Sequence, residues 1–168
     1  MHENVCLIPL TQSQVTVVDA EDYEALAGFK WFADRDRSGF YAVRKAKRDA
    51  DGRRHTVFLH RVITSAPMGI MVDHINRDTL DNRRANLRLC SNAENQRNRT
   101  STRGSSSAFL GVSWKTRDRK WQACLTINGS TKYLGHFICE MEAARAYDAA
   151  AIYYFGEFAN PNFRVVAS

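Results

Sequence analysis

A stretch of polar residues divides this chain into two parts and limits the core that either part can build. Residues 99–107, with the sequence RTSTRGSSS, consist of Ser, Thr, Gly and Arg and hold no apolar side chain that could anchor them. Such a composition is typical of a linker. We therefore expect two small modules, residues 1–98 and residues 108–168, instead of one domain spanning all 168 residues.

The first module is expected to be rich in β-strands. Apolar and polar residues alternate over residues 14–19 (QVTVVD), and the segments 29–33 (FKWFA), 40–45 (FYAVRK) and 55–60 (HTVFLH) are rich in aromatic or β-branched side chains, as strands are. The dipeptide Asp51–Gly52 indicates a hairpin turn between the last two segments. These patterns predict a small antiparallel sheet and carry no chemistry of their own.

A strand, a polar loop, a second strand and a helix are expected at the end of this module. The apolar runs at residues 70–75 (IMVDHI) and 85–90 (ANLRLC) predict the two strands. The polar segment at residues 91–99 (SNAENQRNR) predicts the helix, with Ser91 or Asn92 as its cap.

The polar residues of this segment fit the needs of phosphodiester hydrolysis. That reaction requires a base for the attacking water and a cation to offset the charge of the transition state. Asp73 and His74 are adjacent, and because neighbouring side chains on a strand point to opposite faces, the pair must lie at a strand end or on a twisted strand to converge. Asn95 is the expected second oxygen ligand, with Asn98 as an alternative, and Asn86 is placed to hold the loop and orient the imidazole.

The segment LHRVI … MVDHINRDTLDNRRANLRLCSNAENQRNR, at about residues 57–99, resembles the HNH endonuclease family, especially the His-Asn-Asn form of phage and intron homing endonucleases. The resemblance implies a ββα fold around one metal ion over about residues 70–98. It makes His74 the general base, Asn86 the structural asparagine, and Asp73 and Asn95 the metal ligands. The last letter of the motif is Asn95 here instead of histidine.

The expected cofactor is a hard divalent cation. Carboxylate and amide oxygens suit Mg²⁺ or Mn²⁺, so we expect one such ion per active site. The four cysteines, at positions 6, 90, 124 and 139, form no close pair and no cluster with histidine, so no zinc is expected. We also expect no small-molecule cofactor. His60 belongs to the same motif, and the sequence leaves open whether it reaches the active site or only packs.

The second module is expected to be a three-stranded antiparallel sheet with one helix, which makes the whole chain α+β. Strands are predicted at residues 108–115 (AFLGVSWK), 120–127 (KWQACLTI) and 131–137 (TKYLGHF), with a type I′ turn at Asn128–Gly129. Residues 140–156 (EMEAARAYDAAAIYYFG) predict a helix with acidic residues in its first turn and a glycine at its end.

These patterns resemble the Apetala/ethylene-response-factor DNA-binding domain, in which the sheet lies in the major groove and the helix packs behind it. Alternation along the strands sorts the side chains into two faces. The core face is expected to hold Val112, Trp121, Ala123, Leu125, Leu134 and Phe137, with Trp114 ambiguous. The DNA face is expected to hold Ser113, Lys115, Arg117, Gln122, Cys124, Thr126 and Tyr133. A small module for protein contacts is the alternative interpretation.

Charge and hydropathy agree with a nucleic-acid-binding protein. The net charge is +6 and no run of eighteen apolar residues exists, so we expect a nucleic acid as the partner and no membrane. The two resemblances imply that this partner is double-stranded DNA and that the protein acts in the cytoplasm of a bacterial or phage-infected cell. Arg88 and Arg97 are expected to contact phosphates near the cut. The sequence thus predicts a metal-dependent DNA endonuclease guided by its second module. The alternatives are a DNA-binding regulator with a vestigial nuclease centre and a structural phage protein.

Overall fold

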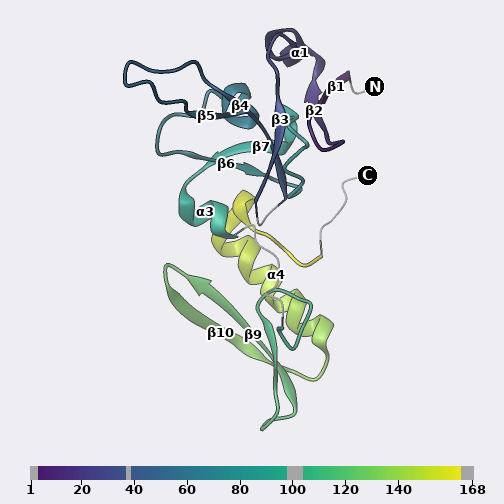
Figure 1. Cartoon of the computed structure of the whole chain (residues 1–168). Coiled ribbons are helices and arrows are strands. Elements are labelled where there is room, and N and C mark those ends of the chain that lie inside the picture. The colour runs from purple at the N-terminus through teal and green to yellow at the C-terminus, as the bar shows by residue number, and fades with distance from the viewer. Residues whose placement is uncertain (1–3, 37–38, 98–103, 164–168) are drawn as a thin grey trace. The chain divides into compact units, whose positions relative to one another are not determined.

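The computed structural model describes residues 4–36, 39–97 and 104–163, the side chain of Arg97 excepted. The chain forms two compact units, residues 1–95 and residues 96–168, and each is described here by itself (Figure 1). Most of the expected linker, at residues 99–103, lies outside the described residues. No helix in the described part of the chain is long and apolar enough to cross a membrane.

The first unit begins with an antiparallel hairpin of β1 (Val5–Pro9) and β2 (Val15–Asp19), followed by α1 (Ala20–Ala27). Helix α1 was not expected. It starts where the alternation of β2 ends at Asp19, carries Glu21 and Asp22 in its first turn, and is followed by Gly28. Acidic side chains at a helix N-terminus are favourable because they meet the positive end of the helix dipole.

A three-stranded antiparallel sheet comes next, in the order β3 (Phe32–Arg35), β4 (Phe40–Lys45) and β5 (Thr56–Phe58). This confirms the antiparallel sheet that the aromatic segments predicted. The segment at residues 55–60 was expected to be a strand throughout, but β5 ends at Phe58 and α2 (Leu59–Ile63) follows directly. Leu59 and Ile63 are buried in the core of the unit, four residues apart as on one helix face.

The strands β6 (Met71–His74) and β7 (Leu87–Cys90) form an antiparallel pair, with the short 3₁₀ turn η1 (Arg84–Asn86) before β7 and α3 (Asn92–Arg97) after it. The predicted order of strand, loop, strand and helix is therefore present. One core joins these elements to the N-terminal hairpin, through residues Ile8, Val18, Leu26, Trp31, Ala42, Leu59, Ile63, Val72 and Leu87.

The second unit is a three-stranded antiparallel sheet in the order β10 (Ser130–Phe137), β9 (Lys120–Ile127), β8 (Val112–Lys115), followed by α4 (Glu140–Phe155) and the 3₁₀ turn η2 (Gly156–Phe158). Asn128 and Gly129 have φ of 49° and 81°, as the predicted type I′ turn requires. Helix α4 packs on β9, β10 and β8. The core is built on Val112, Ala123, Ala143 and Ala144, and its small alanines allow the helix to approach the sheet closely.

Candidate active site

Two adjacent polar residues lie buried at the end of β6. Asp73 and His74 are 6% and 5% exposed, and His74 is the last residue of the strand. The pair therefore lies at a strand end, one of the two positions at which the sequence analysis expected the two side chains to converge. Burying an ionisable side chain is unfavourable without specific partners, so the contacts of the two residues define the site.

Asp73 is held by an arginine on the neighbouring strand. Arg88 lies directly opposite Asp73 in the pairing of β6 with β7, and its Nε and Nη2 donate to Asp73 Oδ2 at 2.9 and 2.7 Å. Their side chains are only 13% and 7% exposed. Arg88 was expected to contact a phosphate, but the structure engages it with the carboxylate of the site.

The imidazole of His74 is kept neutral by its surroundings. Burial lowers the pKa of His74, while the hydrogen bond with Asn82 and the charges of nearby carboxylates oppose this effect. Its Nε2 lies 3.2 Å from Asn82 Oδ1. Tyr41 packs edge-on against the ring, with the two ring centroids 6.2 Å apart. A neutral imidazole can accept a proton, which is the property required of a general base.

His60, at the start of α2, packs against the same imidazole. The two histidine rings meet edge to face with centroids 5.2 Å apart. Burial lowers the pKa of His60 to about 3, with the neighbouring His74 and Arg61 adding to the effect. His60 is therefore an uncharged aromatic neighbour of the candidate base.

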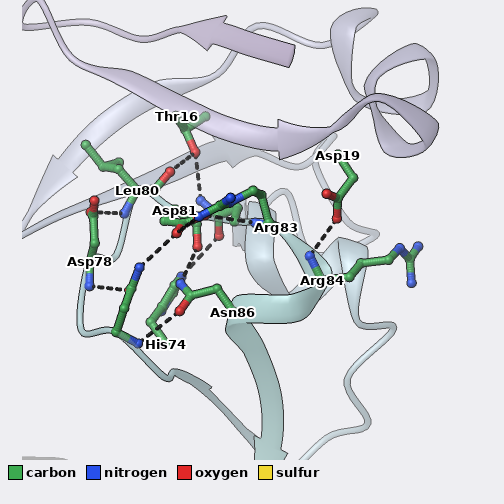
Figure 2. Close-up of polar contacts among 11 residues, drawn as sticks. Thr16, Asp19, His74, Asp78, Leu80, Asp81, Arg83, Arg84 and Asn86 are labelled. Atoms are coloured by element: carbon green, nitrogen blue, oxygen red, sulfur yellow. Dashed lines mark hydrogen bonds and ion pairs between the residues drawn. The ribbon is translucent and has the colours of Figure 1, made fainter. Parts of the chain in front are cut away.

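The loop between β6 and β7 is held by asparagine and aspartate side chains (Figure 2). Asn86 Oδ1 accepts from the backbone N–H of Asn76 at 2.9 Å, and its Nδ2 donates to the backbone oxygen of Asp81 at 2.7 Å. Asp81 receives Nε and Nη2 of Arg83 at 2.8 and 2.9 Å, and these hydrogen bonds are the main reason that the pKa of Asp81 is lowered. Asn86 thus holds the loop, whereas the side chain bonded to the imidazole is Asn82.

Sequence reasoning missed Asn82. It lies in the stretch DTLDNRRANL, between the segments that carry the motif, and it is 1% exposed. Nothing local distinguishes it from the other polar residues of this loop. The only signal in the sequence was that Asn82 lies eight residues after His74, in a loop that starts at the strand carrying the histidine.

Helix α3 carries Asn95, the remaining predicted ligand. Ser91 and Glu94 form a capping box, with Glu94 Oε2 accepting from the Ser91 N–H at 2.7 Å and Ser91 Oγ accepting from the Glu94 N–H at 3.3 Å. Asn95 follows on the first turn and is half-buried.

Burial raises the pKa of the Cys90 thiol to about 11, and the charges of Asp73 and Glu94 contribute.

The donor set fits a hard divalent cation. Asp73 offers a carboxylate oxygen at the end of β6 and Asn95 an amide oxygen on α3, and Mg²⁺-type sites use one or two such protein oxygens. A second acidic group, Asp19, Glu21 and Asp22, is bound instead by Arg84, which contacts Asp22 Oδ1 at 2.7 Å and Glu21 Oε1 at 3.2 Å. The acidic group therefore serves as an ion-pair cluster.

The outer face of the second unit carries the residues expected to contact DNA. Lys115, Arg117, Thr126 and Tyr133 are exposed, and Ser113 and Gln122 are half-buried. A hollow of about 470 Å³ on this face is lined by Lys115, Arg117, Gln122 and Tyr133 among others. On the opposite face Val112, Ala123 and Leu125 are buried, as predicted, and Trp121, Leu134 and Phe137 are half-buried.

Thr116, Asp118 and His136 also line this hollow and were not expected from the sequence. Asp118 and His136 lie 3.9 Å apart, and Asp118 also pairs with Arg117 at 3.0 Å. The hydrogen bond from Arg117 lowers the pKa of Asp118. The face therefore presents a mixture of charges with an aromatic side chain, Tyr133, and not a uniformly basic surface.

Part of the first unit is similar to a known family. Residues 57–97 match the family model of HNH endonucleases, and this range contains the Asp73–His74 pair, β6, β7 and α3. This part of the chain is therefore similar to HNH endonucleases, a class of nucleases.

Several curated proteins are similar to parts of the chain. An uncharacterized HNH endonuclease of Acanthamoeba polyphaga mimivirus is 36% identical over 110 residues, which are 62% of this chain and 56% of that protein. Protein 3.8 of Escherichia phage T7 is 30% identical over 77 residues, 46% of this chain and 64% of that protein. APETALA2-like protein 2 of rice is 37% identical over 70 residues, 42% of this chain and 16% of that protein. The chain thus spans about half the length of the mimivirus protein.

Proposed function

We propose that this chain is a metal-dependent endonuclease that cleaves double-stranded DNA, with its active site at the end of β6. The observation that carries the proposal is the buried pair of Asp73 and His74, in which burial keeps the imidazole neutral. The match of residues 57–97 to HNH endonucleases supports the reaction class.

In this proposal His74 accepts the proton of the attacking water, and Asn86 keeps the loop around it in place. Asp73 and Asn95 would hold one Mg²⁺ or Mn²⁺. When bound, the cation offsets the negative charge of the phosphate and the leaving oxygen. Arg88, at 2.7 Å from Asp73 Oδ2, orients the carboxylate toward this role.

The second module, residues 108–168, is proposed to position the DNA, with residues 1–98 as the nuclease domain and residues 99–107 as the linker. Its contacts are proposed to come from the polar face of the sheet, through Ser113, Lys115, Arg117, Gln122, Thr126 and Tyr133. The resemblance of this unit to plant DNA-binding domains supports the proposal, as do the similar APETALA2-like proteins. Arg97 is proposed as a phosphate contact of the nuclease domain.

We also propose that the chain is a phage-associated or homing endonuclease acting in the cytoplasm of a bacterial or infected cell. The similarity to a protein of Escherichia phage T7 supports the phage association.

One observation favours a second candidate, a DNA-binding regulator with a vestigial nuclease centre. Two hydrogen bonds from Arg88 already engage Asp73 Oδ2, and a carboxylate that no longer bound metal would be expected to gain such a partner.

Cleavage of supercoiled plasmid separates the two candidates. The nuclease should nick or linearise the plasmid with Mg²⁺ or Mn²⁺ and not with a chelator. His74→Ala should lower the rate by about 10²–10⁴-fold, the usual effect of losing a general base, and leave DNA binding intact. His55→Ala, which changes a histidine that is 68% exposed in its side chain, is the matched control. Cleavage by the His74 variant at the wild-type rate would refute the assignment, and binding without any cleavage would support the regulator.

A further inference from the structure

The loop that carries Asn82 is paired with the N-terminal strand β2. The N–H of Val17 donates to the backbone oxygen of Leu80 at 2.9 Å, and the backbone oxygen of Val17 accepts from the N–H of Asn82 at 2.8 Å. Two residues after Asn82, the N–H of Arg84 donates to Asp19 Oδ2 at 2.7 Å. Figure 2 shows the side chains of Thr16 and Asp19, both on β2, pointing toward the loop. Strand β2 therefore sets the path of the backbone beside His74.

Side chains continue this contact into the site. Thr16 on β2 and Asn82 are 0% and 1% exposed. The hydroxyl of Thr16 lies 2.7 Å from the backbone oxygen of Leu80, and Asn82 Nδ2 lies 2.7 Å from Thr16 Oγ1. A hydroxyl has one proton to donate and a carbonyl can only accept. The proton of Thr16 therefore goes to Leu80, and Thr16 accepts from the amide of Asn82.

This arrangement fixes the orientation of the Asn82 amide. With Nδ2 turned toward Thr16, Oδ1 faces His74 Nε2 at 3.2 Å. Because Oδ1 is an acceptor, a neutral His74 must carry its proton on Nε2, which leaves the lone pair on Nδ1.

We propose that Asn82 is a positioning residue that fixes the tautomer and the ring orientation of His74, and that Thr16 holds Asn82 for this purpose. The N-terminal hairpin is then a working part of the nuclease site and not only a scaffold beside it. The inference rests on the proposed role of His74 as the base, and adds the residues that determine which nitrogen acts.

The test compares two buried threonines in the full-length protein. Thr16→Val removes the hydroxyl that orients Asn82. Thr79→Val is the matched control, since Thr79 is 9% exposed and its hydroxyl likewise donates to a backbone carbonyl, that of Phe40 at 2.6 Å, but lies outside the contact chain to His74. Long-range ¹⁵N–¹H correlation spectra of the neutral imidazole, assigned by loss of the signal in His74→Gln, report which nitrogen holds the proton. Plasmid cleavage with Mg²⁺ gives kcat and KM.

The wild type should show the proton on Nε2. Thr16→Val should shift His74 toward a mixture of tautomers and lower kcat by about 10–100-fold, the range for groups that orient a functional histidine, with little change in KM. Thr79→Val should keep the wild-type tautomer and stay within about twofold in kcat. The proposal is overturned if the wild-type proton is on Nδ1, or if the two valine variants lose equal activity with unchanged spectra.

Substitutions at Asn82 give a second test. Asn82→Asp keeps an acceptor in front of Nε2, and Asn82→Leu removes it at similar size, so the Asp variant should retain the Nε2–H tautomer and more activity than the Leu variant. Equal activity of the two folded variants would overturn the proposal. If the buried substitutions prevent folding, the threonine variants decide. If the wild type cleaves no DNA, the nuclease proposal fails, and the spectra alone still decide whether Asn82 and Thr16 set the tautomer.

Discussion

Replacing Arg88 by methionine tests both the stability of the site and its metal binding. The change keeps most of the apolar stem and removes the guanidinium, and with it the hydrogen bonds of 2.9 and 2.7 Å to Asp73 Oδ2. Removing one partner of a buried ion pair costs about 3–5 kcal/mol. We expect the lower end, about 3 kcal/mol, because the side chain of Arg88 is 13% exposed and water reaches it.

For the first unit, of 95 residues, a loss of about 3 kcal/mol corresponds to a fall of roughly 12–24 °C in Tm at 4–8 °C per kcal/mol. If Asp73 is a metal ligand, a bound divalent cation supplies the missing positive charge. Mg²⁺ should then raise the Tm of Arg88→Met more than that of the wild type.

Scanning calorimetry in chelator and in Mg²⁺ measures both effects, and only the transition of the first unit should move. Arg117→Met is the control for a surface pair, because the side chain of Arg117 is 92% exposed, and it should change stability by less than about 1 kcal/mol. A loss below about 1 kcal/mol in Arg88→Met, or equal stabilisation of variant and wild type by Mg²⁺, would refute this reasoning.

Three further predictions follow from burial, backbone geometry and the two-unit architecture. The pKa of His60 is lowered to about 3 in the folded chain from its usual 6.5, so the unfolded state binds more protons between these two pH values. Stability is therefore full above about pH 6.5 and falls toward pH 3, by at most about 1.4 kcal/mol per pH unit, and urea unfolding at several pH values should show a shallower dependence on pH in His60→Gln. Gly111 has φ of +69°, and a Cβ there would lie 2.1 Å from Tyr147 Cδ2, so Gly111→Ala should lower the free energy of unfolding by about 3 kcal/mol, measured by thermal unfolding. Gly129 has φ of +81° but open space around it, so Gly129→Ala should lower the free energy of unfolding by only about 1 kcal/mol. Residues 104–168 alone should bind duplex DNA at low salt and residues 1–100 should cut with less site preference; a nuclease fragment with the full preference would contradict the role given to the second unit.

Local sequence patterns predicted the parts of the fold that local interactions decide. The alternation at residues 120–127, the Asn128–Gly129 turn, the cap at Ser91 and the alanine-rich helix α4 all follow from the neighbouring residues. The sequence did not predict that the segment LHRVI forms a helix, because a short apolar run fits a strand and a buried helical turn equally well.

The site was only partly predictable for a related reason. The Asp73–His74 pair is visible as a dipeptide, but the partner of each residue is not. Arg88 reaches Asp73 through strand register, and Asn82 reaches His74 through a loop whose shape depends on Thr16, 66 residues away in the chain. No periodicity or spacing encodes such long-range pairing.

The pairing of β2 with the loop also determines when the site can exist during synthesis. Its hydrogen bonds join residues 63 to 66 apart in the chain, and contacts of large sequence separation form late because the intervening chain must first be ordered. When only the N-terminal hairpin has been synthesised, Thr16 cannot yet contact Asn82. When synthesis has reached β6, the chain still lacks the loop and the strand β7 that follows it. The cluster of side chains around His74 is therefore among the last parts of the first unit to form. If the proposed function holds, a nascent chain would gain the ability to cut DNA only once that unit had folded.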